Sequence, residues 1–251
     1  LDFADGRSFS SWSRSIMRAV AESGIISGYP DGTFRPQNNI SRGEAAAMLV
    51  KAIGQPVSTG GVHSLGSVYG NVTVNTSGVT LRDTTIAGDL YLTGGIGLGD
   101  VLLENVSVLG RIIASGGGES SGGQNSVLLR NVSASEMIVD SIGDHFVTIR
   151  TEGDTDIGTT SVRTSSYLED VTPKGYGMHR IEIDGESGMN VQLAGNIKEV
   201  VNKTPASRLV LAQGVVGKVT VDEQAVGSAL VIDGSARAEE VNLDVGTGVT
   251  G

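Results

Sequence analysis

The chain has 251 residues, of which 37 are glycine, about double the usual share, and only 4% are aromatic, so Val, Leu, Ile and Ala must build any core. The formal net charge of −10 argues against a nucleic-acid-binding protein, and no apolar run reaches the roughly 18 residues that a membrane-spanning helix needs. Cysteine is absent, which excludes disulfides and thiolate metal sites. Because Leu1 is not an initiator methionine and no signal peptide is visible, we expect a mature product or an excised fragment.

Net charge and the spacing of apolar residues divide the sequence into two parts. Residues 1–60 contain six Lys or Arg and five Asp or Glu, whereas residues 61–251 contain twelve and twenty-three. The first part has helical periodicity, and the second has short β-branched runs separated by glycine. We therefore predict a helical module at 1–54, a linker at 55–67 and a β domain at 68–251.

The first part predicts two helices around a loop. Trp12, Ile16 and Val20 fall on one face of a helix. Residues 41–44, Ser-Arg-Gly-Glu, form a capping box in which the serine and the glutamate each bond the other's backbone N–H. Gly54 is placed to end this second helix.

The order and spacing of these pieces resemble one repeat of the S-layer homology family. The matching segments are Phe3-Ala4-Asp5, Trp12, the loop from Gly24 to Pro36 with its Pro30-Asp31-Gly32 turn, and Ile40 to Glu44. The resemblance implies non-covalent attachment to the secondary polysaccharide of a Gram-positive-type cell wall, a ligand that commonly carries acidic pyruvyl groups.

The resemblance also implies a set of binding residues. Arg42 is expected to meet the negative charge of the ligand. It lies in a first helical turn, where the helix dipole disfavours a cation, which favours a functional role or an ion pair. The pocket would be shaped by Asp5, Trp12, Gly28, Tyr29, Asp31 and Gly32.

Structural roles explain several of these residues equally simply. Trp12 and Phe34 are predicted most simply as core residues, because large aromatic side chains dominate small cores. Asp31 is expected to form the turn, Glu44 to cap the helix, and Asp5 to act as a local cap.

The sequence departs from the family in two ways. The usual Thr-Arg-Ala-Glu is Ser-Arg-Gly-Glu at residues 41–44. The family generally has three tandem repeats with sugar sites in the grooves between them, whereas this chain has one. Neighbouring copies complete the site by homotrimerisation, preceding repeats are missing, or the lone repeat does a different job.

The second part repeats itself. Three stretches, Val79–Leu92, Val101–Ala114 and Val127–Asp140, align without gaps, and fainter starts follow at Val147, Ile181, Leu209 and Leu230. Spacings of 20 to 34 residues between short, glycine-broken strands predict a right-handed parallel β-helix of about seven coils.

The aligned positions predict the cross-section of each coil. Asp83, Asn105 and Asn131 share one place, where Asn and Asp tolerate a left-handed bend and their side chains can bond along the axis. Residues 164–180 are expected to be the longest irregular stretch. The side chains expected to point inward are Val79, Leu81, Ile86, Leu90 and their equivalents in the other coils.

Two further features bear on location and assembly. The stretches Gly88–Leu92 and Gly116–Glu119 look like the solenoid of S-layer-homology surface proteins from Paenibacillus-like bacteria, which implies an extracellular, cell-wall location. Val245–Gly251 shows no cap, and an open strand edge favours a homo-oligomer, either a trimer or a head-to-tail filament.

An enzyme is the remaining alternative, since many β-helices are polysaccharide lyases or hydrolases. The candidate groups are Asp154, Asp156, Asp184 and Glu186, with Arg150 and Arg180 nearby, although solvated surface acids explain them equally well. The histidines at 63, 145 and 179 lack metal-site spacing, so we expect no metal and no cofactor.

We predict a non-enzymatic surface-layer protein anchored to wall polysaccharide. The alternatives are a self-assembling extracellular fibre or lattice subunit and a polysaccharide-degrading enzyme. Neither nucleic-acid binding nor membrane insertion is expected.

Overall fold

The computed structural model describes residues 3–22, 25–118, 126–141 and 146–244. The chain divides into two compact units, Leu1–Gln55 and Pro56–Gly251. Among the described residues, helices are all too short or too polar to cross a bilayer.

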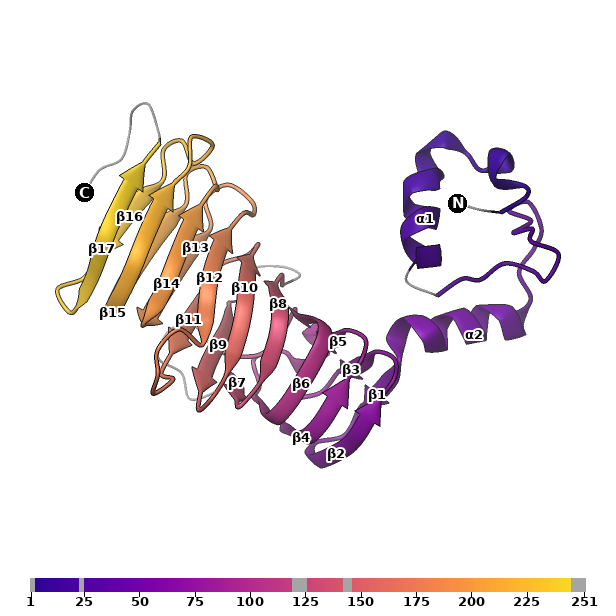
Figure 1. Ribbon diagram of the computed structural model, residues 1–251, viewed down its shortest axis with the longest axis horizontal. Coiled ribbons are helices and arrows are strands. Elements are labelled where there is room, and N and C mark those ends of the chain that lie inside the picture. The colour runs from indigo at the N-terminus through magenta and orange to yellow at the C-terminus, as the bar shows by residue number, and fades with distance from the viewer. Residues whose placement is uncertain (1–2, 23–24, 119–125, 142–145, 245–251) are drawn as a thin grey trace. The chain divides into compact units, whose positions relative to one another are not determined.

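The N-terminal unit is helical (Figure 1). Its elements are η1 (Gly6–Ser8), η2 (Ser11–Ser13), α1 (Arg14–Glu22) and α2 (Arg42–Ile53). The predicted capping box opens α2: the Glu44 N–H donates to Ser41 Oγ at 3.2 Å, and the Ser41 N–H donates to the Glu44 carboxylate at 2.8 Å. Gly54, at φ 69°, ends the helix as expected.

Three phenylalanine rings form the centre of this unit. Phe34 lies 5.4 Å from Phe3 and 5.2 Å from Phe9 between ring centroids, so its predicted place in the core is confirmed. The same prediction for Trp12 is wrong, because its side chain is 75% exposed. The three rings pack on one another, whereas the side chains of Trp12 in η2 and Ile16 in α1 are both exposed.

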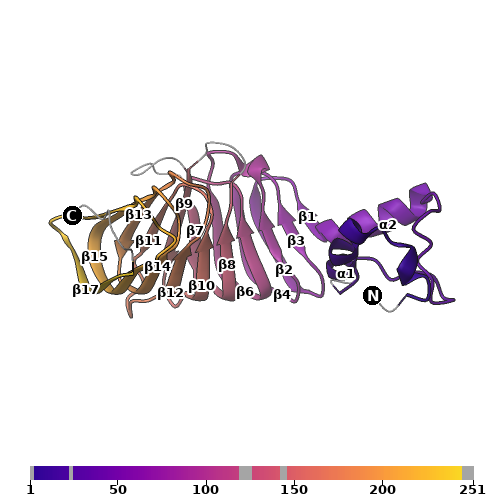
Figure 2. The same ribbon diagram turned by 90° about the horizontal axis from the view of Figure 1, so that it is seen from above.

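The C-terminal unit is a parallel β-solenoid of about eight turns, which confirms the predicted fold class (Figures 1 and 2). Its strands lie side by side along one axis, and they pair in parallel, as β10 does with β12, β15 with β17 and β4 with β6. The strands are β1 (Gln55–Val57), β2 (Gly61–Val68), β3 (Val72–Val74), β4 (Val79–Ile86), β5 (Leu90–Leu92), β6 (Val101–Ala114), β7 (Val127–Arg130), β8 (Ser133–Val139), β9 (Val147–Glu152), β10 (Asp156–Val162), β11 (Ser166–Asp170), β12 (Met178–Ile183), β13 (Asn190–Gly195), β14 (Ile197–Asn202), β15 (Arg208–Val221), β16 (Ala229–Ile232) and β17 (Ala236–Leu243). A short 3₁₀ turn, η3 (Gly94–Ile96), follows β5.

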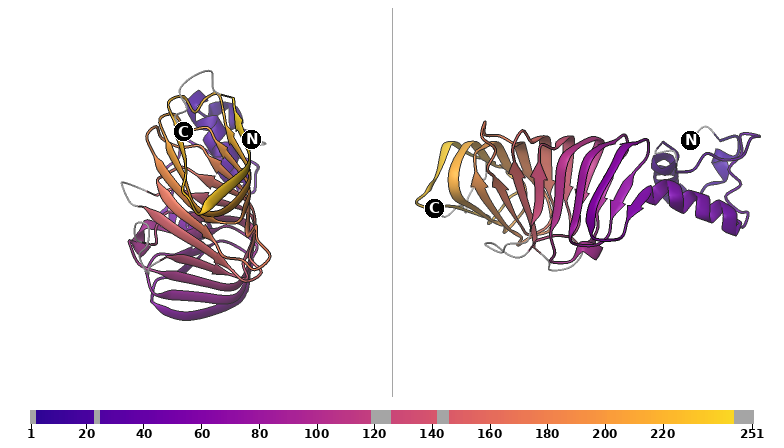
Figure 3. Two further views of the ribbon diagram at one scale, coloured as in Figure 1. Left: turned by 90° about the vertical axis from the view of Figure 1, so that its left-hand side faces the viewer. Right: turned by 90° about the horizontal axis from the view of Figure 1, so that it is seen from below.

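Successive coils place the same position of the repeat in one column. Leu81 pairs with Leu103, and Leu103 pairs with Leu129. The coils nest around a common interior (Figure 3) that such columns of aliphatic side chains fill. The predicted inward residues are confirmed, each 0–3% exposed: Val79, Leu81, Ile86, Leu90, Val101, Leu103, Val108, Ile112, Val127 and Leu129.

The gapless alignment fails in one place within these coils. It predicts Ile138 opposite Ile112, but Met137 occupies that position. The register shifts between Val108 and Arg111, where β6 has an extra residue relative to β8. A bulge of this kind changes the register of the strands without changing the pattern of apolar residues, so the sequence alone does not predict it.

The fainter starts are less accurate. Val127 pairs with Ile149 rather than with the predicted Val147. Ile181 does not start a coil, because it lies in β12 and pairs with Thr160 of β10. The coil that contains Ile181 starts at Ser166, where a buried serine takes the place of the expected aliphatic residue. Two further coils, which start in β2 and β13, raise the number above the seven predicted.

Two stretches that the sequence predicts to be without regular structure contain strands. Residues 55–67, expected to be a linker, include β1 and most of β2, and residues 164–180 include β11 and the start of β12. Between those strands, the buried Asp170 carboxylate accepts hydrogen bonds from the Thr172 N–H at 2.9 Å and the Gly177 N–H at 2.7 Å. The predicted open end at 245–251 lies outside the described residues.

The predicted Asn/Asp ladder, at Asp83, Asn105 and Asn131, is confirmed. All three residues have positive φ, between 48° and 55°. The Asn105 amide donates to Asp83 Oδ1 at 3.1 Å, and the Asn131 amide donates to Asn105 Oδ1 at 2.9 Å. Asn131 Oδ1 in turn accepts from the Asp154 N–H at 2.9 Å, which joins a fourth coil to the ladder.

Charges on the outer surface alternate in sign from coil to coil. One row runs Arg180, Glu199, Lys218, Glu240 in strand register. Ion pairs join Arg180 to Glu199, and Lys218 to Glu240 at 3.4 Å. On another face, Arg130 bridges Glu104 and Glu152.

Leu103→Asp should prevent folding of the solenoid, because it places an unpaired charge in a dry column at a cost of more than about 4 kcal/mol. The matched control is Leu109→Asp, since Leu109 is 68% exposed on the same strand. Thermal unfolding followed by circular dichroism distinguishes the two. A Leu103→Asp protein as stable as the control would show that this column is not inward.

Asn131→Ala should destabilise the solenoid more than Asn131→Gly. Both lose the ladder bonds, but only alanine adds strain at φ 55°, of about 1–2 kcal/mol. Urea unfolding of the three proteins measures the difference. Equal midpoints for the two variants would contradict a left-handed bend at this position.

Candidate functional site

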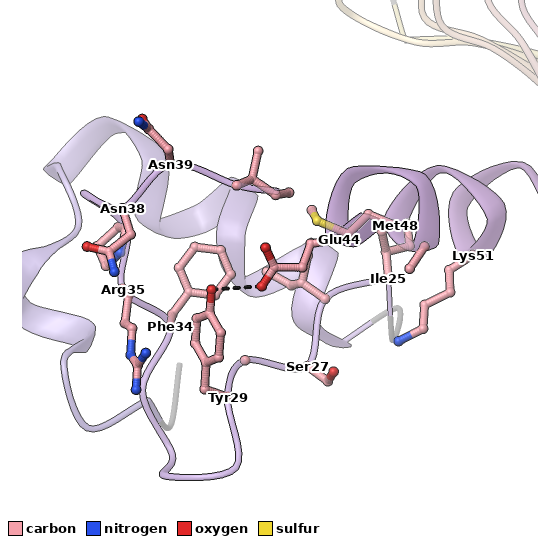
Figure 4. Close-up of a pocket in the computed structure, with 15 residues that line it drawn as sticks. Ile25, Ser27, Tyr29, Phe34, Arg35, Asn38, Asn39, Glu44, Met48 and Lys51 are labelled. Carbon is pink, nitrogen blue, oxygen red and sulfur yellow. Dashed lines mark hydrogen bonds between the residues drawn. The ribbon is translucent and has the colours of Figure 1, made fainter. Parts of the chain in front are cut away.

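The N-terminal unit has a cavity of about 300 Å³ between the loop at 25–40 and α2 (Figure 4). Ile25, Phe34 and Met48 supply apolar walls, as the close-up shows. The polar lining residues are Ser27, Tyr29, Arg35, Asn38, Asn39, Glu44 and Lys51. A mostly apolar cleft with a few polar groups is the ordinary form of a small-ligand site.

Glu44 ties this cavity to the start of α2. The Tyr29 hydroxyl donates to Glu44 Oε1 at 2.9 Å. Bonds from Ser41, then from Tyr29, lower the pKa of the Glu44 carboxyl, while the acceptor Glu44 raises the pKa of Tyr29. Glu44 is therefore a charged cap with its oxygens already engaged, as its structural interpretation predicts.

Arg35 and Asp31 form a second polar group beside Tyr29. The Arg35 guanidinium lies 4.3 Å from the centroid of the Tyr29 ring and pairs with Asp31 at 2.5 Å. Asp31 also accepts hydrogen bonds from the Thr33 hydroxyl at 2.6 Å and the Thr33 N–H at 3.0 Å. The bonds from Thr33, followed by the bond from Arg35, lower the pKa of the Asp31 carboxyl to about 2. The turn-forming role of Asp31 is confirmed.

Asp5 binds the backbone of the loop at 25–40, although it is far from that loop in sequence. Its two carboxylate oxygens accept from the N–H groups of Phe34 at 2.8 Å and Arg35 at 2.7 Å. The bond from Phe34, followed by that from Arg35, lowers the pKa of the Asp5 carboxyl. Asp5 is thus a clamp between residues about thirty positions apart, and its expected role as a local cap is wrong.

The structure brings together only some of the residues predicted for the site. Gly28 and Tyr29 line the cavity, whereas Asp5, Trp12, Asp31, Gly32 and Arg42 are absent from its lining. Gly28, at φ 70°, has a structural reason: a Cβ there would lie 2.6 Å from the Phe3 ring and 2.9 Å from the Thr33 carbonyl. Gly32, at φ 78°, closes the turn with an N–H bond to the Tyr29 carbonyl.

Arg42 is exposed at the first position of α2. Within the described ranges, it has no carboxylate within ion-pair distance, so an internal ion pair does not account for a cation there. Sequence reasoning missed Arg35 and Lys51, which line the cavity. Lys51 lies three residues after Met48 in α2, a spacing that puts both side chains on the helix face toward the cavity.

The candidate catalytic acids on the solenoid are paired or solvated. Asp154 lies 2.7 Å from Lys174, and Asp156 lies 3.1 Å from His179. Asp184 and Glu186 are exposed. In the part of the chain that the structure describes, no three or more His, Asp or Glu side chains are grouped to hold a metal ion.

Asp5→Ala should weaken the N-terminal unit at neutral pH and lose its effect in acid. A lowered pKa means that the charged form stabilises the fold above the ordinary value of 3.8, and that this contribution disappears as the pH falls through the lower folded value. Amide NMR spectra of the unit's residues during urea titrations at pH 7 and near pH 2 measure it. A pH-independent difference between parent and variant would contradict the clamp.

Comparison with known proteins assigns part of the chain. Residues 2–46 match the S-layer homology domain. Cell surface glycoprotein 1 of Acetivibrio thermocellus is 45% identical over 42 residues, 17% of this chain and 2% of that protein. An amylopullulanase of Thermoanaerobacterium thermosulfurigenes is 40% identical over 47 residues, 19% of this chain and 2% of the enzyme. The middle cell wall protein of Brevibacillus brevis is 29% identical over 82 residues, 32% of this chain and 8% of that protein.

The chain thus covers only a small part of the length of these relatives. No solved structure matches it. The family match includes Asp5, the loop to Pro36 and the capping box with Arg42, the segments that carried the resemblance in the sequence. An S-layer homology domain occupies residues 2–46 of this chain.

Proposed function

We propose that this protein is a non-enzymatic component of the bacterial cell surface, attached to wall polysaccharide through its N-terminal domain. The observation that carries the proposal is the S-layer homology domain at residues 2–46. Relatives that share such a segment are named as cell-surface, cell-wall and surface-layer proteins. The location is extracellular, at the cell wall.

Arg42 is the group best suited to an acidic sugar. Its guanidinium is exposed and, among the described residues, free of a carboxylate partner, while the neighbouring Glu44 is held by the capping box. A planar guanidinium bonds a carboxylate through two parallel N–H groups, which suits a pyruvyl substituent. The wall polysaccharide proposed as ligand is therefore one that carries such acidic groups.

The cavity beside Tyr29 supports a second contact for the same chain of sugars. Its apolar walls suit the C–H face of a sugar ring, and its rim supplies Asn38, Asn39 and Lys51 as donors. Arg35 and Asp31 hold the Tyr29 ring and the turn at its edge. Asp5 then acts by shaping the loop rather than by touching the ligand, whereas Gly28 both lines the cavity and lets the loop adopt its left-handed conformation.

The solenoid serves as the exposed, structural part of the protein. Its candidate acids are engaged by Lys174 and His179 or lie in solvent, which supports a structural role over polysaccharide cleavage. The amylopullulanase shows that such a domain also occurs in an enzyme, but the match to that enzyme extends over 47 residues.

Association of several copies is the second part of the proposal. The domain exposes four large apolar side chains on η2, α1 and α2, those of Trp12, Ile16, Leu49 and Val50. Neighbouring domains in a homotrimer, or in a filament, would cover these side chains and complete the grooves between repeats.

Arg42→Ala should lower affinity for pyruvylated wall polysaccharide about tenfold or more while the fold survives, because a charged hydrogen bond contributes about 1.5–3 kcal/mol. The control is Arg18→Ala, which removes the same charge from an exposed site on α1. Co-sedimentation with purified wall polysaccharide, with and without its acidic groups removed, measures affinity. Equal binding by the two variants would remove Arg42 from the site, and no binding by the parent protein would reject the proposed function.

A further inference from the structure

The outer face of the solenoid has an open hollow of about 390 Å³ where β6, β8 and β10 lie side by side (Figure 1). Its outward-facing residues form two rows across these strands. In the first row, Ser107 of β6 pairs with Ser133 of β8, and Ser133 pairs with Asp156 of β10. The second row consists of Leu109, Ser135 and Gly158. Three hydroxyl groups, a carboxylate and an apolar side chain thus surround one hollow.

Short side chains keep the middle of the hollow open. A Cβ at Gly158 would lie 2.6 Å from the Ser135 carbonyl oxygen, so a larger residue there would displace the backbone. The Ser133 hydroxyl donates to the Ser107 hydroxyl at 3.1 Å. Because a hydroxyl has one donor and two acceptor positions, this single bond leaves both groups able to bond a ligand.

The bulge in β6 shapes one rim of the hollow. The register shifts between Val108 and Arg111, and Leu109, which lies in this bulge, is 68% exposed. Bulges re-aim side chains and are common beside functional sites. The hollow therefore has an apolar rim on the β6 side.

Asp156 and His179 form the opposite rim. The Asp156 side chain is 70% exposed, and its Oδ1 lies 3.1 Å from His179 Nε2. Its Oδ2 accepts no hydrogen bond from the described residues, so this oxygen is available to a ligand. Elsewhere on the outer surface, charges are paired with each other from coil to coil, as Arg180 is with Glu199.

We propose that this hollow binds a neutral glycan chain that lies along the solenoid axis across β6, β8 and β10. Sugar hydroxyls donate to Asp156 and exchange hydrogen bonds with the serine hydroxyls, while the C–H face of a ring contacts Leu109. Neighbouring strands are about 4.8 Å apart. This spacing is close to the length of one pyranose unit in a linear β-linked chain, so Ser107 and Ser133 meet equivalent groups of successive sugars.

Charge favours a neutral glycan over an acidic one. None of the described residues that line the hollow is Lys or Arg. The exposed carboxylate of Asp156 lies in a part of the chain, residues 61–251, that has twenty-three Asp or Glu and twelve Lys or Arg. An acidic polymer would be repelled by this surface. The hollow thus differs in chemistry from Arg42, which the proposed function assigns to acidic groups.

Residue-specific NMR of the full chain tests the site. The neutral probes are cellotetraose and tetra-N-acetylchitotetraose, and the acidic probe of the same length is tetragalacturonate. At millimolar concentration, the neutral probes should shift the amide signals of β6, β8 and β10 around the hollow, whereas the acidic probe should not. The proposal is overturned if neither neutral probe shifts these signals, or if tetragalacturonate shifts them as much. Signals of the N-terminal domain report separately on binding there, so this outcome leaves the proposed function untouched.

Two pairs of variants test the residues themselves. Ser133→Ile fills the hollow, and its control, Ser64→Ile, makes the same change at an exposed site on β2. Asp156→Asn removes the free carboxylate, and its control is Asp154→Asn, since Asp154 is exposed and paired with Lys174.

Both test variants should bind the neutral probe about tenfold or more weakly, because each loses hydrogen bonds to the sugar, and both controls should bind it as the parent does. Thermal unfolding verifies that the variants are folded. If Ser133→Ile does not fold, Asp156→Asn decides, since its side chain is mostly in solvent. Parental affinity in either folded test variant would overturn the proposal.

Discussion

Parallel hydrogen bonding between successive coils is the constraint on which the solenoid depends. Each strand pairs in register with the equivalent strand of the next coil, so the residues at equivalent positions of successive coils stack in a column along the axis. Aliphatic columns form a continuous dry interior, as Leu81, Leu103 and Leu129 illustrate. The same stacking turns Asn105 and Asn131 into an amide ladder and makes neighbouring charges alternate, since like charges would lie one strand spacing apart.

That constraint also explains what the sequence could and could not predict. Repeats at Val79, Val101 and Val127 reveal the coil because identical environments select similar residues, and the ladder was predictable from aligned Asp and Asn. The coil that begins at Ser166 was missed because its inward column includes a buried serine. The bulge in β6 was missed because an extra residue at a corner changes register without changing composition.

In the N-terminal domain, local signals were reliable and distant ones were not. The capping box and the Asp31 turn depend on residues two or three apart, so spacing alone predicted them. The clamp from Asp5 to the Phe34 and Arg35 N–H groups joins segments that only the fold brings together. Exposure of Trp12 was equally hidden, because composition does not say which aromatic residues fill a small interior. The residues that the loop needs for its shape are thus interleaved with those available to a ligand.

The corner between β6 and β7 has a consequence for how such a protein can change over generations. Val79 and Val101 are paired across a spacing of 22 residues, whereas Val101 and Val127 are paired across 26, yet both pairs keep the same register. The additional length lies, in sequence, between β6 and β7, and the strands on either side keep their register. Peptides inserted there could diversify freely, so a rigid scaffold of this type can acquire new epitopes on the outside of a cell without redesign of its interior.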